Sequence, residues 1–297
     1  MGAPRAALRA ARVLLEMIKF EHTVFALPFA VAGAILAADH AGLPGSLPAA
    51  RTAGWVLAAM VGARSAAMAF NRLVDEAYDR LNPRTACRAL PMGVVSRRAV
   101  WFFTAASAAL LLVSSWQLNP LCLALAPVAL AAVFGYSYTK RFTSLSHLVL
   151  GAAIGVAPSA AWIAVTGGIA PTPVLLSLAV TFWIGGFDII YALQDEAFDR
   201  RTGLHSIPAR FGAARALLLS RMSHVACIAG LVAVGISAGL GAAYYAGVVV
   251  VAVLIAYEQS IVSPGDLRRV NTAFFAMNGW VSVLLLAAIV ADRVVLR

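Results

Sequence analysis

Long apolar runs dominate this sequence and restrict the folds that it can adopt. Hydrophobic residues make up 62% of the 297 positions and charged residues only 12%, against about a quarter charged in soluble domains. An apolar run of about 20 residues spans a bilayer as a helix. The sequence therefore predicts an all-α integral membrane protein, with residues 1–297 forming a single transmembrane domain. We predict about nine transmembrane helices, near residues 20–38, 52–71, 99–117, 120–138, 145–165, 173–194, 213–237, 241–259 and 271–291.

Basic residues gather in alternate connections between the predicted helices. Lys and Arg accumulate in cytoplasmic loops, and the connection between the second and third helices holds Arg72, Arg80, Arg84, Arg88, Arg97 and Arg98. The connections Gln117–Asn119 and Thr166–Gly168 are uncharged. We therefore expect a multi-pass protein of a bacterial-type inner (plasma) membrane with a cytoplasmic N-terminus. The net charge of +10 follows from this topology and from attraction to membrane lipids, so it requires no nucleic-acid partner.

The two ends of the chain carry further basic residues. Residues 1–19 place basic side chains on one stripe and apolar side chains on another, which predicts an amphipathic helix at the membrane interface rather than a cleaved signal peptide. At the other end, nine spans would leave Arg293 and Arg297 outside, against the charge rule. The three cysteines and five histidines show no metal-binding spacing.

A repeated hexapeptide carries six of the 13 acidic residues. The segment 75–80 reads DEAYDR and the segment 195–200 reads DEAFDR, each at the end of an apolar run. Two aspartates four residues apart share one helix face at about 5–6 Å, where they repel by roughly 3 kcal/mol at an effective dielectric near 20. Carboxylate oxygens suit Mg²⁺, which also binds substrate phosphates. The repeat therefore predicts that Mg²⁺ and a diphosphate bind between Asp75, Asp79, Asp195 and Asp199.

The same hexapeptides contain two glutamates that we assign differently. Glu76 lies four residues before Arg80, and Glu196 lies four residues before Arg200. A glutamate four residues before an arginine forms a favourable surface pair on a helix. We therefore predict structural ion pairs for the glutamates and metal binding for the aspartates.

Basic loops follow both hexapeptides, at about residues 80–98 and 200–212. Their arginines match phosphate oxygens, and their Pro and Gly residues indicate ordered turns, so we predict lids over a cytoplasmic active-site mouth. The preferred phosphate ligands are Arg88, Lys140 and Arg141. For any single arginine, contact with anionic lipid is the alternative.

Two further charges lie deeper in the predicted helices. Arg64 precedes Asn71 by seven residues, and Asp188 precedes Asp195 by seven, which places each about two helical turns further into the membrane. Charges at this depth are costly unless they are paired or face a polar cavity. Either Arg64 and Asp188 pair with each other, or they line a cavity floor that binds a polar acceptor molecule.

These segments resemble two motifs of the UbiA superfamily of intramembrane prenyltransferases. The segment 71–79, NRLVDEAYD, is similar to the NxxxDxxxD motif, and the segment 191–199, YALQDEAFD, to the YxxxDxxxD motif. The stretches NPRT at 82–85 and GLHSIPARFG at 203–212 resemble the 4-hydroxybenzoate polyprenyltransferase branch, including its menaquinone-pathway relatives. The sequence departs from the family pattern at Ala89, where a proline is expected.

The resemblance implies nine helices around a central cavity that opens laterally to the bilayer. It implies Mg²⁺-dependent transfer of a polyprenyl group from an isoprenyl diphosphate to an aromatic acceptor, either 4-hydroxybenzoate or a related hydroxylated aryl or naphthoic acid, in ubiquinone or menaquinone biosynthesis. Taking residues and resemblance together, we predict that Asn71, Asp75, Asp79, Asp195 and Asp199 bind the metal, and that Asp188 joins the four aspartates as catalytic. We predict that the substrates are bound by Arg64, Asn71, Arg72, Arg84, Arg88, Lys140, Arg141, Tyr191 and Ser206.

Two alternatives remain open from the sequence. A membrane transporter built from parallel repeats would also combine apolar helices with buried charges. Within the same family, the acceptor could instead be haem or a chlorin.

Overall fold

The computed structural model describes residues 13, 14, 16, 17, 23–273 and 277–296. The predicted interfacial helix at 1–19 falls almost wholly outside these residues. The described secondary structure is helical apart from one isolated bridge between Ser263 and Asp266. The long helices are α2 (Thr23–His40), α3 (Ala50–Leu81), α4 (Arg97–Leu118), α5 (Pro120–Thr139), α6 (Ser146–Gly155), α7 (Ala157–Thr166), α8 (Pro171–Ala192), α11 (Ala213–Ala238), α12 (Ala242–Ser260) and α14 (Asn278–Val290).

These helices confirm the predicted fold class. Within the described residues, eight helical segments are long and apolar enough to cross a membrane, and the shorter apolar helix Ala26–His40 accompanies them. Together they follow the nine predicted apolar runs in order. The chain is a multi-pass, all-α membrane protein.

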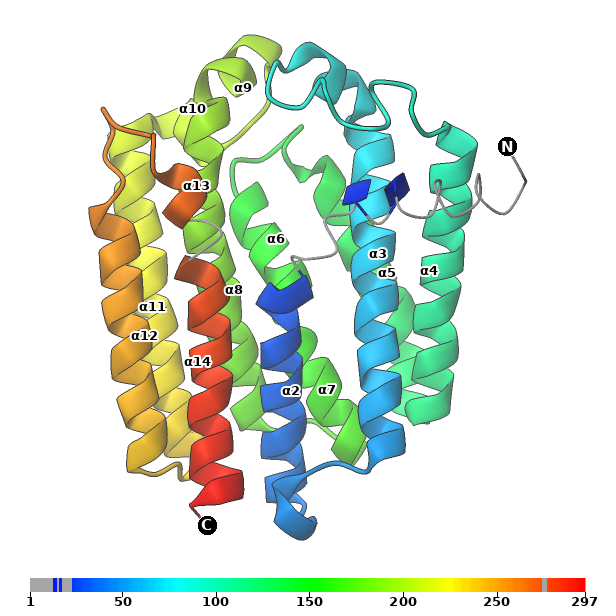
Figure 1. Ribbon diagram of the computed structural model, residues 1–297, viewed down its shortest axis with the longest axis vertical. Helices are drawn as coiled ribbons and strands as arrows, with labels where there is room; N and C mark the ends of the chain where they lie inside the picture. Colours follow the sequence, from blue (N-terminus) through cyan, green and yellow to red (C-terminus); the bar gives the residue numbers. More distant parts are fainter. Residues whose placement is uncertain (1–12, 15, 18–22, 274–276, 297) are drawn as a thin grey trace.

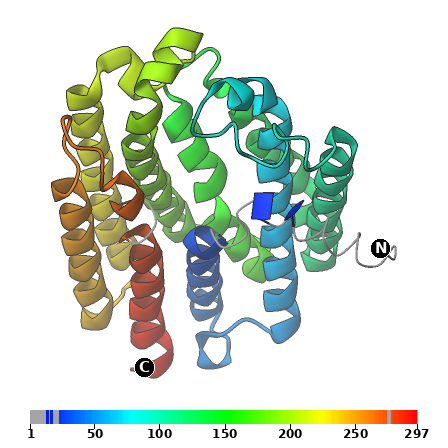
Figure 2. The same cartoon turned by 45° about the horizontal axis from the view of Figure 1, so that its top comes forward.

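The helices form a ring (Figures 1 and 2). Neighbours in contact run in the order α2, α14, α12, α11, α8, α6, α5 and α3, and α3 contacts α2 again. The largest apolar core lies between α2, α8, α11, α12 and α14, around the buried Trp183 and Tyr244. Short helices α9 (Glu196–Thr202) and α10 (Ile207–Phe211) lie at the top of Figure 1, near the loop that joins α3 to α4.

The fifth predicted span is broken in the middle. α6 ends at Gly155, and α7 begins at Ala157 with Pro158 in its first turn. Proline has no N–H to continue the hydrogen-bond ladder, so the helix breaks there. α7 then packs closely on α2, where a Cβ on Gly33 would lie 2.4 Å from the carbonyl oxygen of Pro158.

The two helices that carry the acidic repeats end differently. α3 continues ten residues beyond its predicted end at residue 71, so the first repeat is helical throughout. α8 ends at Ala192, and the second repeat passes through the 3₁₀ turn η3 (Leu193–Asp195) into α9. Asp195 and Asp199 therefore do not share one regular α-helix, because i→i+3 hydrogen bonds replace the α-helical ones at Asp195.

α14 runs to the opposite end of the bundle from α9 and α10 (Figure 1), and η5 (Ala291–Val295), which follows it, carries Arg293. Its Nε atom lies 3.6 Å from Asp39 Oδ2 and 3.5 Å from Asp292 Oδ2. Its Nη2 atom donates to the carbonyl oxygens of Ala238 and Gly239 at 2.7 and 2.6 Å. The late positive charge thus has two acidic partners and two carbonyl partners.

Candidate active site

A cavity of about 980 Å³ lies inside the ring and reaches the end of the bundle at which both acidic repeats lie. It collects charged side chains from α3, α8, η3 and α9 and from the α3–α4 and α5–α6 connections. The predicted site residues that line it are Arg64, Asn71, Arg72, Asp75, Asp79, Arg84, Arg88, Lys140, Arg141, Asp188, Tyr191, Asp195 and Asp199.

The first repeat presents its aspartates from one face of α3. Asn71 Nδ2 donates a hydrogen bond to Asp75 Oδ2 at 2.9 Å. Arg88 Nη1 donates to both oxygens of Asp79, at 2.7 and 2.8 Å, and Arg72 Nη1 lies 3.9 Å from Asp79 Oδ2. Each predicted aspartate ligand of this helix therefore has a donor from within the site.

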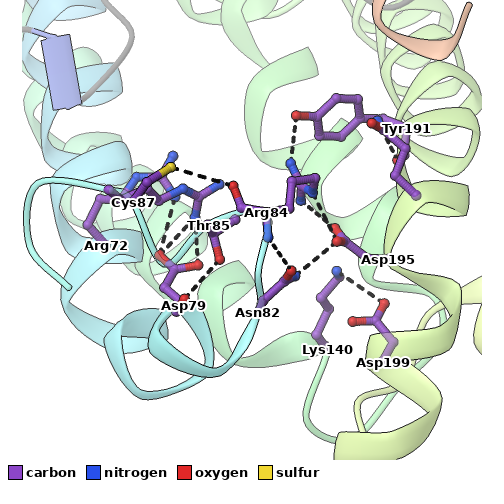
Figure 3. A network of polar contacts seen from close by, with 12 residues as sticks. Arg72, Asp79, Asn82, Arg84, Thr85, Cys87, Lys140, Tyr191, Asp195 and Asp199 are labelled. Atoms are coloured by element: carbon purple, nitrogen blue, oxygen red, sulfur yellow. Dashed lines mark hydrogen bonds and ion pairs between the residues drawn. The ribbon is translucent and has the colours of Figure 1, made fainter. Parts of the chain in front are cut away.

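The second repeat is held by residues from two other connections (Figure 3). Asp195 Oδ1 accepts from Asn82 Nδ2 and from Arg84 Nε, both at 3.0 Å, and Arg84 Nη2 donates to Asp195 Oδ2. Asp199 Oδ2 lies 3.5 Å from Lys140 Nζ. The first loop is thus attached to the second repeat through Asn82 and Arg84.

Arg84 connects Asp195 to the tyrosine of the second motif. Its Nη1 donates to Tyr191 Oη at 2.9 Å, and its guanidinium lies 5.1 Å from the centre of the Tyr191 ring. Burial lowers the pKa of Arg84, but its hydrogen bonds to Asp195 and Tyr191 outweigh burial, and the net pKa is raised above the usual value. Arg84 is therefore a permanent cation at the cavity wall.

Arg141 also lines the cavity and contacts α3 and α5. Its Nη2 donates to the carbonyl oxygen of Val74 at 2.8 Å, and its guanidinium lies 5.4 Å from the Tyr78 ring centre and 5.1 Å from that of Tyr138. These contacts join the short α5–α6 loop to α3.

The glutamates form the predicted helix pairs. Glu76 Oε1 accepts from Arg80 Nη2 at 2.7 Å, and Glu196 Oε1 accepts from Arg200 Nη2 at 3.0 Å. Glu76 also accepts from Arg97 of α4, a contact that sequence reasoning missed. Glu76 is therefore a buried link between α3 and α4, whereas Glu196 is part of a more exposed pair.

At the inner end of the cavity, Arg64 and Asp188 both face the interior. The contact of Asp188 is with His147 of α6, whose Nδ1 lies 2.7 Å from Asp188 Oδ2. His147 was not predicted, because no metal or catalytic spacing marks it in the sequence.

Two further residues differ from expectation. Ser206 is fully buried and caps α10 by accepting from the backbone N–H of Ala209 at 3.3 Å, and it is not among the residues that line the cavity. Asn82 was not proposed for the site, although it binds Asp195. Its place in the NPRT stretch, which begins two positions after the last residue of the first repeat, is the signal that could have identified it.

The donor set fits the implied Mg²⁺. Asp75, Asp79, Asp195 and Asp199 all line one cavity, and carboxylate oxygens are the ligands that Mg²⁺ prefers. No three acidic, His or Cys side chains converge as a metal cluster within the described residues. Asp79, Asp195 and Asp199 are paired with Arg88, Arg84 and Lys140.

The sequence matches the model of the UbiA prenyltransferase family over residues 26–281. The chain belongs to this family. It is therefore a prenyltransferase, which favours the enzyme over the transporter hypothesis. The predicted resemblance to the superfamily is confirmed.

Relatives and solved structures agree with this assignment. The 4-hydroxybenzoate octaprenyltransferase of Alkalilimnicola ehrlichii is 32% identical over 231 residues, which cover 77% of this chain and 78% of that protein. The enzyme of the same description from Xanthomonas campestris is 35% identical over 231 residues, covering 77% and 75%. The apo structure of a UbiA homologue from Aeropyrum pernix has a TM-score of 0.82 at 37% identity, covering 91% of this chain and 98% of that one. A UbiA homologue from Archaeoglobus fulgidus bound to DMAPP and Mg²⁺ shares the fold, with a TM-score of 0.70 at 21% identity over 95% of this chain and 99% of that one.

Proposed function

We propose that this UbiA-family protein transfers a polyprenyl group from an isoprenyl diphosphate to a hydroxylated aromatic acid, in a step of quinone biosynthesis that requires Mg²⁺. The observation that carries the proposal is the gathering of four motif aspartates and several arginines in one cavity at one end of an apolar bundle. The relatives named 4-hydroxybenzoate octaprenyltransferase favour 4-hydroxybenzoate or a related aryl or naphthoic acid over haem or a chlorin.

The outer part of the cavity is proposed to bind the diphosphate. Asp75, Asp79, Asp195 and Asp199, with Asn71, would hold Mg²⁺, which when bound neutralises the diphosphate and improves it as a leaving group. Arg84, Arg88 and Lys140 now pair with three of these carboxylates. When substrate and metal bind, each ion pair can be replaced by two new contacts: the cation binds a phosphate oxygen, and the carboxylate binds the metal. Exchange of partners leaves no buried charge without a counter-charge.

The inner part of the cavity is proposed to bind the acceptor. Arg64 lines it about two helical turns from Asn71, and we assign Arg64 to the acceptor carboxylate. The acceptor ring would then lie below the diphosphate, and a ring carbon would form a bond to the allylic carbon as the bond to diphosphate breaks. The ring carbon then loses its proton, and the released diphosphate can take up this proton.

The membrane setting follows from the substrate. An isoprenoid tail is hydrocarbon, so it can lie among apolar side chains or lipid while the diphosphate stays at the polar end. We propose that this end and the N-terminus face the cytoplasm of an inner membrane, because the basic connections cluster there. The loop at 82–96 and the segment 203–212 would act as lids.

The test is a substrate panel with the purified protein in detergent. Prenyl diphosphates of several lengths are combined with 4-hydroxybenzoate, a hydroxynaphthoic acid, benzoate and 4-hydroxybenzamide, and products are identified by mass spectrometry. We expect prenylated products from the hydroxylated acids, and their loss when Mg²⁺ is chelated at constant ionic strength. Failure of every pair, or unchanged turnover after chelation, would overturn the proposal.

The role of Arg64 has its own test. Arg64→Gln is expected to raise the KM for the acceptor by about tenfold or more, since a hydrogen-bonded charge contributes about 1.5–3 kcal/mol, and to change the KM for the prenyl diphosphate little. Equal increases in both KM values would argue against a carboxylate-binding role.

A further inference from the structure

Asp188 and His147 form a pair at the inner end of the cavity, apart from both aspartate motifs. The His147 side chain is fully buried, whereas the Asp188 side chain keeps 21% of its surface exposed and lines the cavity. The pair is therefore open to the cavity on the carboxylate side only.

The other ring nitrogen of His147 has a partner in the segment 203–212. The backbone N–H of Ile207, at the start of α10, donates to His147 Nε2 at 3.3 Å. A backbone amide can only donate, so Nε2 is the acceptor nitrogen of the ring and Nδ1 carries the proton. Nδ1 therefore donates to Asp188 Oδ2 at 2.7 Å.

Two neighbouring contacts hold the segment 203–212 against the α5–α6 connection. The backbone N–H of His205 donates to the carbonyl oxygen of Lys140 at 2.6 Å, and Arg210 Nη1 donates to Ser144 Oγ at 3.3 Å. The contact of Ile207 with His147 differs from these two, because His147 also bonds to Asp188 at the inner end of the cavity. His147 is thus a direct link between the proposed second lid and Asp188.

One of the two carboxylate oxygens of Asp188 is hydrogen-bonded to His147. Within the described part of the chain, Oδ2 has its hydrogen bond to His147, and Oδ1 has no hydrogen-bond partner. Asp188 lines the cavity, and a carboxylate oxygen without a donor from the chain suits a hydroxyl donor, which the proposed acceptors carry. A hydrogen bond from the ring hydroxyl to a carboxylate also raises the electron density of the ring that attacks the allylic carbon.

We propose that His147 is a positioning residue that orients Asp188 so that Oδ1 accepts a hydrogen bond from the acceptor hydroxyl. Through Ile207, the same histidine ties this orientation to the docking of the segment 203–212. The inference rests on the proposed function, because it assumes a hydroxylated aromatic acceptor. Neither His147 nor Asp188 forms a covalent bond in this role.

Two substitutions separate the two bonds of His147. His147→Asn places an amide donor near the position of Nδ1, so it can keep the contact with Asp188. His147→Gln places an amide oxygen near the position of Nε2, so it can keep the contact with Ile207 and loses the one with Asp188. His224→Gln is the matched control, because His224 is a buried histidine of α11 that bonds to Gln259 and does not line the cavity.

We expect His147→Gln to raise the acceptor KM by about tenfold or more, the effect of losing a hydrogen bond to a charged group. The KM for the prenyl diphosphate should stay within about twofold, and His147→Asn should recover most of the acceptor affinity. The control should change neither KM. Equal increases in both KM values, or a lower thermal midpoint with both KM values at the wild-type level in His147→Gln, would overturn the proposal.

A measurement without turnover separates this inference from the proposed function. Nitrogen NMR of the histidine-labelled wild-type protein, with the His147 signal assigned by its loss in His147→Gln, should show a protonated Nδ1 and an unprotonated Nε2. Adding a hydroxylated aromatic acid without prenyl diphosphate should shift the Nδ1 signal, whereas benzoate should not. A protonated Nε2, or equal responses to both acids, would overturn the role of His147 even if prenyl transfer is observed. Absence of transfer in the wild type, with the predicted tautomer and selective shift, would instead count against the proposed function.

Discussion

The aspartates of the site differ from ordinary surface acids in their burial and in their partners. Asp79, Asp195 and Asp199 are at most 7% exposed, and each lies against an arginine or a lysine from a connecting loop. Removing one member of a buried pair leaves the other uncompensated. The proposed function accounts for this pairing, because a metal and a polyanion that bind together would replace both partners of each pair.

The two glutamates of the hexapeptides should respond differently to neutralisation. Glu76→Gln removes the charge that Arg80 and Arg97 share, and we expect it to lower the free energy of unfolding by about 1–3 kcal/mol. Glu196→Gln affects one exposed pair, so its effect should stay below about 1 kcal/mol. Thermal unfolding in detergent checks both values. Neither variant should lose prenyl transfer, and a loss comparable to that of an aspartate variant would contradict our division of the repeat.

Spacing predicted the residues that a motif carries, and missed those that only the fold brings together. The aspartates and Arg88, which all line the cavity, were proposed because the repeat and its loop are local patterns. His147 and Asn82 were missed because their partners lie 41 and 113 positions away in the chain. Ser206 was proposed from its place in a family stretch, and its hydroxyl instead caps α10.

At the scale of helices, apolar runs predicted the spans well and their ends poorly. α3 continues beyond its apolar run because the charged residues of its last turns face the cavity and the loops instead of lipid. The break between α6 and α7 depends on Pro158, which an apolar window does not register. The 3₁₀ turn at Asp195 has no counterpart in the first repeat, although the two sequences are nearly identical.

The crossing of α6 and α8 places His147 against Asp188 and depends on glycine. A Cβ on Gly151 would lie 2.3 Å from the carbonyl oxygen of Thr181, which is backbone and cannot rotate away. We expect Gly151→Ala to lower the free energy of unfolding by about 1–3 kcal/mol, as overpacking does, and to raise the acceptor KM.

Gly135→Ala is the control for this crossing, because a Cβ at Gly135 of α5 meets nothing within 4 Å. Its free energy of unfolding should change by less than about 1 kcal/mol. Equal destabilisation by the two alanines in thermal unfolding would show that the α6–α8 contact is not the cause.

At the scale of the whole molecule, labelling of cysteines can test the proposed orientation of the protein in the membrane. Cys87 is exposed beside the cavity, whereas Cys227 is buried. If the site faces the cytoplasm, an impermeant maleimide should label Cys87 in inside-out vesicles and not in intact cells. Ile169, 69% exposed in the α7–α8 connection, should show the reverse pattern as Ile169→Cys in a Cys87→Ser background. Labelling of Cys87 in intact cells would invert the proposed orientation.

The most direct test of the whole account is prenyl transfer by Asp75→Ala and Asp195→Ala, measured by mass spectrometry with saturating Mg²⁺ beside Glu196→Gln as the matched control. Thermal unfolding establishes that each variant is folded. The Asp→Asn versions remove the charge and keep the shape of the side chain. We predict that both aspartate variants lose at least about 100-fold in turnover, roughly 2.7 kcal/mol of barrier, while the control stays near wild type. Folded alanine variants that both retain turnover within about threefold of wild type, roughly 0.7 kcal/mol, would contradict the account.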